Sequence, residues 1–257
     1  TGGKRPKIII GKDTRLSGAM LEHALSAGIC SAGGKALRVG VLPTPGVAHL
    51  TLSEGADAGV MISASHNPFY DNGIKIFGCD AFKLSDNAEV EIEALLAEED
   101  RLRVRCETVQ DVGDDFRIDD AEDRYLWFLE STLPAGFRLD GMKLVLDCAN
   151  GATFRVAPAL FKGLGADVEA LFIEPDGRNI NGGCGSQHTG RLAERVVESG
   201  AAIGLARHRR CRPVFGHGVP HTRHGQHGAR RGHRRDPRQA PGEGDVLPRQ
   251  RAHAARR

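Results

Sequence analysis

The chain has 257 residues, of which 40% are hydrophobic and 26% charged, and its formal net charge is +2 at pH 7. Such a chain is long and apolar enough to fold as one large or two medium α/β domains with a proper core. It contains no apolar run of about 18 residues that could span a membrane, and its start lacks a signal-peptide pattern. We therefore expect a cytoplasmic protein without a membrane partner.

Strands and helices are predicted to alternate in the first part of the chain. In chain order, the expected elements are a strand at 8–10, a helix over 17–32, a strand at 37–42, a helix around 47–53 and a strand at 59–63. This alternation is typical of parallel α/β units. Because the sequence starts so close to a strand, we expect the first unit to lack an opening strand and helix.

A second α/β unit is predicted after a helical stretch at about 122–133, in which we expect Trp127 to lie in the core. Its expected elements are a strand at 142–147, a helix at 157–164, a strand at 168–172 and a helix at 191–199. The six cysteines show no paired or zinc-type spacing, which favours free thiols in a reducing compartment.

Two polar features of this second unit have a structural and a functional interpretation. Asp147 ends a predicted strand, and we favour a structural aspartate that caps the turn at Asn150 and Gly151 over a metal or ribose ligand. The glycine cluster at 182–185 could cradle a phosphate through backbone amides, but glycines alone are weak evidence for that.

The clearest chemistry lies in the segment 63–68 and the turn at 71–75 that follows it. A free serine hydroxyl such as that of Ser65 is a poor nucleophile and needs a neighbouring base or a pre-formed covalent state. His66 and Lys75 could supply this help, because the proline and the turn residues would bring the lysine back toward the serine. The segment therefore predicts a phosphoryl-transfer site, with an ordinary surface loop as the alternative.

The preceding strand supports this interpretation. Its apolar, β-branched residues at 59–63 are typical of a buried strand, which would deliver Ser65 to the carboxyl end of the sheet. Open α/β sheets place their ligand sites at that end.

The whole run from 63 to 75 resembles the phosphoserine loop of the α-D-phosphohexomutases. Three further stretches are similar to the phosphoglucosamine mutase branch of this family, namely 11–18, 147–152, and 179–181 together with 184–186. The resemblance covers residues 1 to 206. It implies two phosphohexomutase-type α/β domains, which we place at 1–120 (partial) and 139–206 (partial), joined by a connecting helix at 121–138 and followed by a tail at 207–257.

The resemblance also implies a mechanism and site residues. Ser65 would carry the phosphate, Lys75 and Arg15 would act in acid/base chemistry or clamp phosphate, and His66 would help organise the site. The substrate would be a hexosamine phosphate, converted from glucosamine 6-phosphate to glucosamine 1-phosphate through a bisphosphate for amino sugar biosynthesis, with Mg²⁺ as cofactor. From the residues alone, Arg15 could equally be a solvated residue at a helix start and Lys75 a surface turn lysine.

The composition changes after Ala206. Residues 207–257 contain 14 arginines, no lysine and three acids, a formal charge of +11, whereas residues 1–206 contain 21 bases and 30 acids, a charge of −9. The tail has few aliphatic side chains and no sustained period, so we expect it to be disordered. An arginine-rich arm that binds nucleic acid is one interpretation of this composition.

We prefer a reading-frame shift as the origin of the tail. The family is expected to carry a magnesium-binding loop, Asp-Gly-Asp-x-Asp-Arg, directly after a sequence such as 204–206. Back-translating 208–217 with CGN arginine codons and reading one base later permits Gly-Asp-Ala-Asp-Arg-Cys-Leu-Ala. Without those aspartates, the phosphate on Ser65 would be the remaining metal ligand, and we expect little turnover from this chain.

Two alternatives to a phosphoglucosamine mutase remain open at this point. A phosphomannomutase or phosphoglucomutase would share the Ser65 loop. A noncatalytic fragment would use the arginine-rich tail to bind nucleic acid, which we consider the weaker interpretation. The sequence predicts no oligomeric state.

Overall fold

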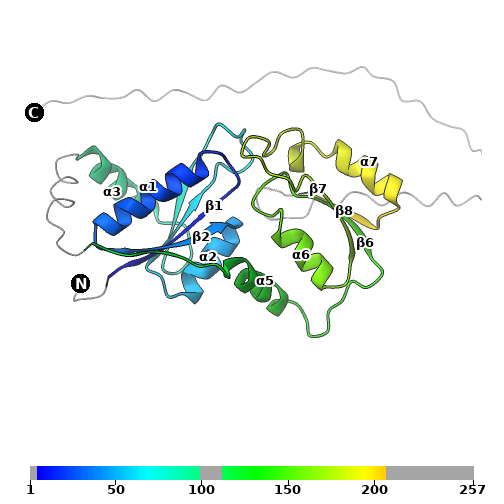
Figure 1. Ribbon diagram of the computed structural model, residues 1–257, viewed down its shortest axis with the longest axis horizontal. Helices are drawn as coiled ribbons and strands as arrows, with labels where there is room; N and C mark the ends of the chain where they lie inside the picture. The colour runs from blue at the N-terminus through cyan, green and yellow to red at the C-terminus, as the bar shows by residue number, and fades with distance from the viewer. Residues whose placement is uncertain (1–4, 99–111, 207–257) are drawn as a thin grey trace, which may run out of the picture. The chain divides into compact units, whose positions relative to one another are not determined.

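A computed structural model of the chain describes residues 5–98 and 112–206 (Figure 1). The tail at 207–257, and with it the predictions of disorder and of a shifted reading frame, lies outside the described residues. Within the described part, no helix is long and apolar enough to cross a membrane.

The first sheet has five strands in the order β4-β3-β1-β2-β5. Its strands are β1 (Lys7–Lys12), β2 (Lys35–Val41), β3 (Ala58–Ile62), β4 (Ile74–Gly78) and β5 (Asp115–Arg117). All neighbours pair in parallel except β4, which returns antiparallel to β3. The three predicted strands of this unit are confirmed, and the return of the chain after the turn at 71–73 forms β4.

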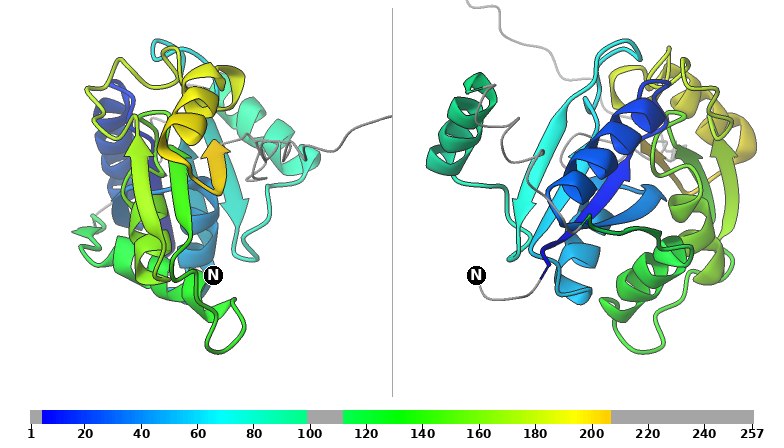
Figure 2. Two further views of the ribbon diagram at one scale, coloured as in Figure 1. Left: turned by 90° about the vertical axis from the view of Figure 1, so that its right-hand side faces the viewer. Right: turned by 60° about the vertical axis from the view of Figure 1, so that its left-hand side comes forward.

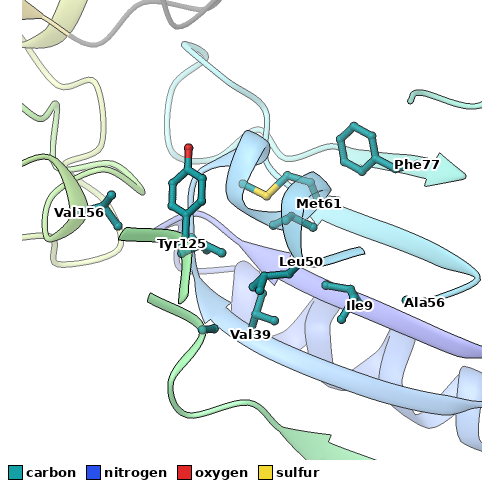
Figure 3. Close-up of a cluster of buried hydrophobic side chains, with 11 residues drawn as sticks. Ile9, Val39, Leu50, Ala56, Met61, Phe77, Tyr125 and Val156 are labelled. Carbon is teal, nitrogen blue, oxygen red and sulfur yellow. The ribbon is translucent and has the colours of Figure 1, made fainter. Parts of the chain in front are cut away.

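Helices cover both faces of this sheet (Figure 2). The helices of this part are α1 (Gly18–Ser31), α2 (Thr44–Ser53), α3 (Asp86–Ala97) and α5 (Ala121–Ser131). Apolar residues of α1 pack against Ile10 and Ile62 on one face. On the other face, Leu50 of α2 and Tyr125 of α5 join Ile9 and Met61 in the largest apolar cluster (Figure 3). The central strands β1 and β3 are therefore buried on both faces, as strands of parallel α/β sheets are.

Trp127 does not lie in the core, so that prediction was wrong. Its side chain on α5 is 72% exposed, whereas Tyr125 two residues earlier is 5% exposed. Two residues correspond to about 200° of helix rotation, which places the tryptophan on the solvent side of the helix. The helix itself was predicted correctly.

The second sheet has three parallel strands in the order β7-β6-β8. Its elements are β6 (Lys143–Asp147), α6 (Val156–Gly163), β7 (Asp167–Leu171), the short 3-10 helix η1 (Gly185–Gln187), α7 (Gly190–Ser199) and β8 (Ile203–Ala206). Residues of α6 pack on the face of Leu144 and Leu146, and residues of α7 pack on the face of Val145. The predicted α/β class, with a second α/β unit, is confirmed.

Candidate active site

The serine loop connects β3 to β4 at the carboxyl end of the first sheet. It runs from Ser63 to Gly73, and β4 then pairs Lys75 with Met61 of β3. Ser65 thus stands beyond the carboxyl end of a strand whose neighbour β1 is parallel, and Lys75 returns beside that strand, as the sequence predicts. Ser65 adopts a left-handed backbone conformation with φ of 60°, which a non-glycine residue keeps only where its surroundings hold it.

A buried polar chain holds the amide of Ser65. Its backbone N–H donates to the Ser63 hydroxyl oxygen at 3.1 Å, and that hydroxyl donates to an Asp13 carboxylate oxygen at 2.6 Å. Ser63 and Asp13 are 2% and 1% exposed, so neither carboxylate nor hydroxyl is hydrated. Each of these buried polar groups must keep its partner, because an unsatisfied one costs about 1–3 kcal/mol.

The guanidinium of Arg15 organises the remainder of the loop. Its Nε donates to Asp13 at 3.0 Å, and the side chain is fully buried. The four Nη protons go to backbone carbonyl oxygens of the serine loop: those of Ser65 at 3.1 Å, Asn67 at 2.9 Å, Asp71 at 3.1 Å, and Pro68. All five donors of the guanidinium are thus engaged. Arg15 is not the solvated residue considered above, and no N–H is left over for a substrate phosphate.

A cavity of about 1300 Å³ opens beside the loop. Ser65, His66 and Lys75 all line it, so the predicted nucleophile, imidazole and ammonium belong to one cavity. Lys75 donates through Nζ to the carbonyl oxygen of Ser63. Among the described residues, Nδ1 of His66 is a buried atom without a hydrogen-bond partner, which suits it to a ligand in the cavity.

Loops of the second sheet contribute to the same cavity. Asp147 accepts the backbone N–H groups of Ala149 at 2.8 Å and Gly185 at 2.7 Å, and burial raises the pKa of its carboxyl group. It is a structural aspartate, as predicted, although it binds different N–H groups from those of the expected turn. Cys184 beside it is buried, and burial together with Asp147 raises the pKa of that thiol to about 11.

One side chain from the second sheet reaches the serine loop itself. Asn181, between β7 and η1, donates through Nδ2 to the carbonyl oxygens of Ser65 at 3.0 Å and Asn67 at 3.1 Å. The sequence alone indicates no role for Asn181 or Asp13, although they lie within the motifs at 179–181 and 11–18. Their partners are 116 and 50 residues away in the chain, so only the folded structure reveals them.

The described residues do not supply a magnesium site. Within 5–98 and 112–206, no group of three or more histidine, cysteine, aspartate or glutamate side chains is placed to hold a metal ion. A phosphate on Ser65 would offer hard oxygen ligands, but a near-octahedral ion needs more than one such group.

Comparison with known proteins places the chain in a family. Residues 1–103 match the family model described as phosphoglucomutase/phosphomannomutase, alpha/beta/alpha domain I. The phosphoglucosamine mutase of Syntrophus aciditrophicus is 57% identical over 206 residues, which cover 79% of this chain and 45% of that protein. That of Desulfotalea psychrophila is 56% identical over 202 residues. The chain belongs to the phosphohexomutase family.

Solved structures place the fold in the same group. A phosphoglucomutase/phosphomannomutase family protein from Burkholderia thailandensis superposes with a TM-score of 0.61 at 26% identity, over 80% of this chain and 44% of that one. A putative phosphomannomutase from Thermus thermophilus has a TM-score of 0.59 at 20% identity, a likeness of fold. The chain spans about half the length of the curated phosphohexomutases that it matches.

Proposed function

We propose that residues 1–206 form the phosphoserine part of a phosphoglucosamine mutase. This enzyme would interconvert glucosamine 6-phosphate and glucosamine 1-phosphate through a bisphosphate, in amino sugar biosynthesis. The observation that carries the proposal is the convergence of Ser65, His66 and Lys75 on one cavity, with the serine backbone held by buried contacts. The identity of more than half of the aligned residues to phosphoglucosamine mutases favours this branch over phosphomannomutase or phosphoglucomutase.

The chemistry follows from what phosphoryl transfer requires. The bond between phosphorus and Oγ of phosphorylated Ser65 breaks as the 1-hydroxyl oxygen of the sugar phosphate bonds to phosphorus, and the hydroxyl gives up its proton. The unpartnered Nδ1 of His66 is available to accept that proton or to orient the hydroxyl. Lys75 supplies positive charge beside the transferring group. The return of the 6-phosphate to Oγ restores the phosphoserine.

Arg15 takes a positioning role in this proposal. Its five donors are committed to Asp13 and to the loop, and Asp13 balances its charge. The pair thus fixes the backbone that carries Ser65 and leaves the phosphate to other cations. Positioning of this kind is the main contribution that a protein makes to phosphoryl transfer.

Magnesium, the cytoplasmic location and the domain bounds at 1–120, 121–138 and 139–206 belong to the same proposal. The phosphate of Ser65 would be one magnesium ligand, and the other ligands would have to come from outside the described residues. No step above depends on that ion.

A chimeric enzyme tests the proposal. The 206-residue segment of the Syntrophus relative that aligns with this chain is replaced by residues 1–206, and conversion of glucosamine, mannose and glucose 6-phosphates is compared. We expect turnover with a preference for the glucosamine substrate and loss of turnover in Ser65→Ala. The matched control Ser53→Ala removes an exposed hydroxyl at the end of α2 and should leave turnover intact. A folded chimera without mutase activity would refute the proposal, and a preference for mannose or glucose would move the chain to another branch.

A further inference from the structure

The two carbonyl oxygens next to the nucleophile are each held from two directions. Arg15, which follows β1 of the first sheet, donates to the oxygens of Ser65 and Asn67. Asn181, from a loop of the second sheet, donates to the same two oxygens at 3.0 and 3.1 Å. A carbonyl oxygen has two lone pairs, so both acceptors are fully used. The serine backbone is therefore fixed jointly by the two sheets.

Asn181 is itself fixed by a buried platform. Its backbone N–H donates to the oxygen of Ala149 at 3.0 Å. Asp147 in turn binds the N–H groups of Ala149 and Gly185, and both acceptor contacts are buried. Asn181 has a left-handed φ of 59°, which asparagine tolerates better than most residues. The position of the Asn181 amide is thus fixed by buried hydrogen bonds within its own part of the chain.

Other contacts join the same regions but do not touch the nucleophile. The hydroxyl of Thr14 donates to the oxygen of Asn150 at 2.5 Å, and the N–H of Leu16 donates to the oxygen of Gly177 at 2.8 Å. These bonds hold the segment that carries Arg15 against the second sheet. Among the described side chains from the part of the chain that forms the second sheet, Asn181 is the one that donates hydrogen bonds to the serine loop.

We propose that Asn181 is a positioning residue for the phosphoserine, which couples the second sheet to the conformation of Ser65. This inference rests on the proposed function. Because Ser65 is in a left-handed conformation that its surroundings must maintain, loss of the two amide bonds lets the backbone relax and Oγ leave its position. The transfer step slows in both directions, while the binding of the sugar phosphate is unchanged, because both Nδ2 protons of Asn181 are already engaged by the loop carbonyls.

The first test measures hydrogen–deuterium exchange in the full 257-residue chain. Asn181→Asp removes both N–H donors at nearly constant shape and tolerates the same φ, and Asn181→Gly removes the amide without adding charge. Loss of two amide bonds predicts exchange about ten- to a hundredfold faster in peptides covering 65–73. Asn179→Asp is the matched control: its amide binds Glu174 and Asp176 on the same loop, away from the serine. Exchange in β1 and α7 should stay constant, which separates a local effect from unfolding.

The second test uses the chimeric enzyme described above. Asn181→Asp should lower kcat about tenfold or more without changing KM for glucosamine 6-phosphate, whereas Asn179→Asp should change neither. Unchanged exchange at 65–73 in Asn181→Gly would overturn the inference, even with an active chimera. An inactive chimera with the expected change in exchange would leave the coupling standing and refute the proposed function instead.

Discussion

Replacing Arg15 with lysine should destabilise the protein even though the positive charge is kept. The guanidinium makes five hydrogen bonds in a planar arrangement, to Asp13 and to four loop carbonyls. A lysine ammonium has three donors and lacks the planar arrangement of the guanidinium, so at least two of the five hydrogen bonds are lost. At about 1.5 kcal/mol for each hydrogen bond to a charged group, the loss is about 3 kcal/mol.

The magnitude can be measured by urea unfolding followed by far-ultraviolet circular dichroism. With an m-value of about 2 kcal/mol/M, a loss of about 3 kcal/mol lowers the midpoint by about 1.5 M. Arg38→Lys is the matched control, because Arg38 also makes a paired contact with a carboxylate, Asp115, but with side chains 22% and 38% exposed. Such surface pairs contribute about 0–1 kcal/mol. If Arg15→Lys and Arg38→Lys differ by less than about 0.5 kcal/mol, the assignment of Arg15 as the organiser of the loop is wrong.

Four further predictions concern the surroundings of the site. Gly59→Ala should cost about 1–3 kcal/mol, because a Cβ would lie 2.1 Å from Oγ1 of Thr51, whereas Gly28→Ala, with open space around it, should be neutral or stabilising in thermal unfolding. In alkylation followed by mass spectrometry at pH 8, the buried Cys184 thiol with its pKa of about 11 should stay unmodified while the exposed Cys79 reacts; equal labelling would contradict this. Burial lowers the pKa of His49, which stacks on Phe128, so the unfolded chain binds a proton more readily and stability should fall as pH drops below about 6.5. His49→Phe should reduce that pH dependence. Trp127, the one tryptophan of the sequence, should emit like a solvated indole and be quenched by acrylamide, and a protected indole would contradict its exposure.

The strands and helices that the sequence predicts correctly are those with uninterrupted apolar runs or clear helical spacing. β1, β3 and β6 are short apolar segments flanked by polar residues. Such a run correctly indicates a strand here, because these three strands are buried on both faces. β5 was not predicted, because its three residues are all exposed and carry no apolar alternation. α3 was also missed, since it buries none of its residues, although the Ser85 cap at its start was a usable signal.

The site was predictable in part for a related reason. Ser65, His66 and Lys75 are close in sequence, so turn residues alone indicate that they converge. The contacts of Arg15 with the loop, and that of Asn181 from the other sheet, depend on how distant segments pack. Local patterns carry no information about such contacts. The prediction that Trp127 lies in the core was wrong for the same reason. Helical spacing alone does not indicate which face of the helix other elements cover.

The most direct test of the account is whether Ser65 of this chain accepts a phosphoryl group. The purified 257-residue protein is incubated with Mg²⁺ and glucosamine 1,6-bisphosphate that carries radioactive phosphorus, and the label is located by peptide mapping. The chimeric enzyme is treated in the same way. We expect label on the Ser65 peptide of the wild type and of Ser53→Ala, and none in Ser65→Ala. Label that persists in Ser65→Ala, or that maps to another residue in both proteins, would contradict it.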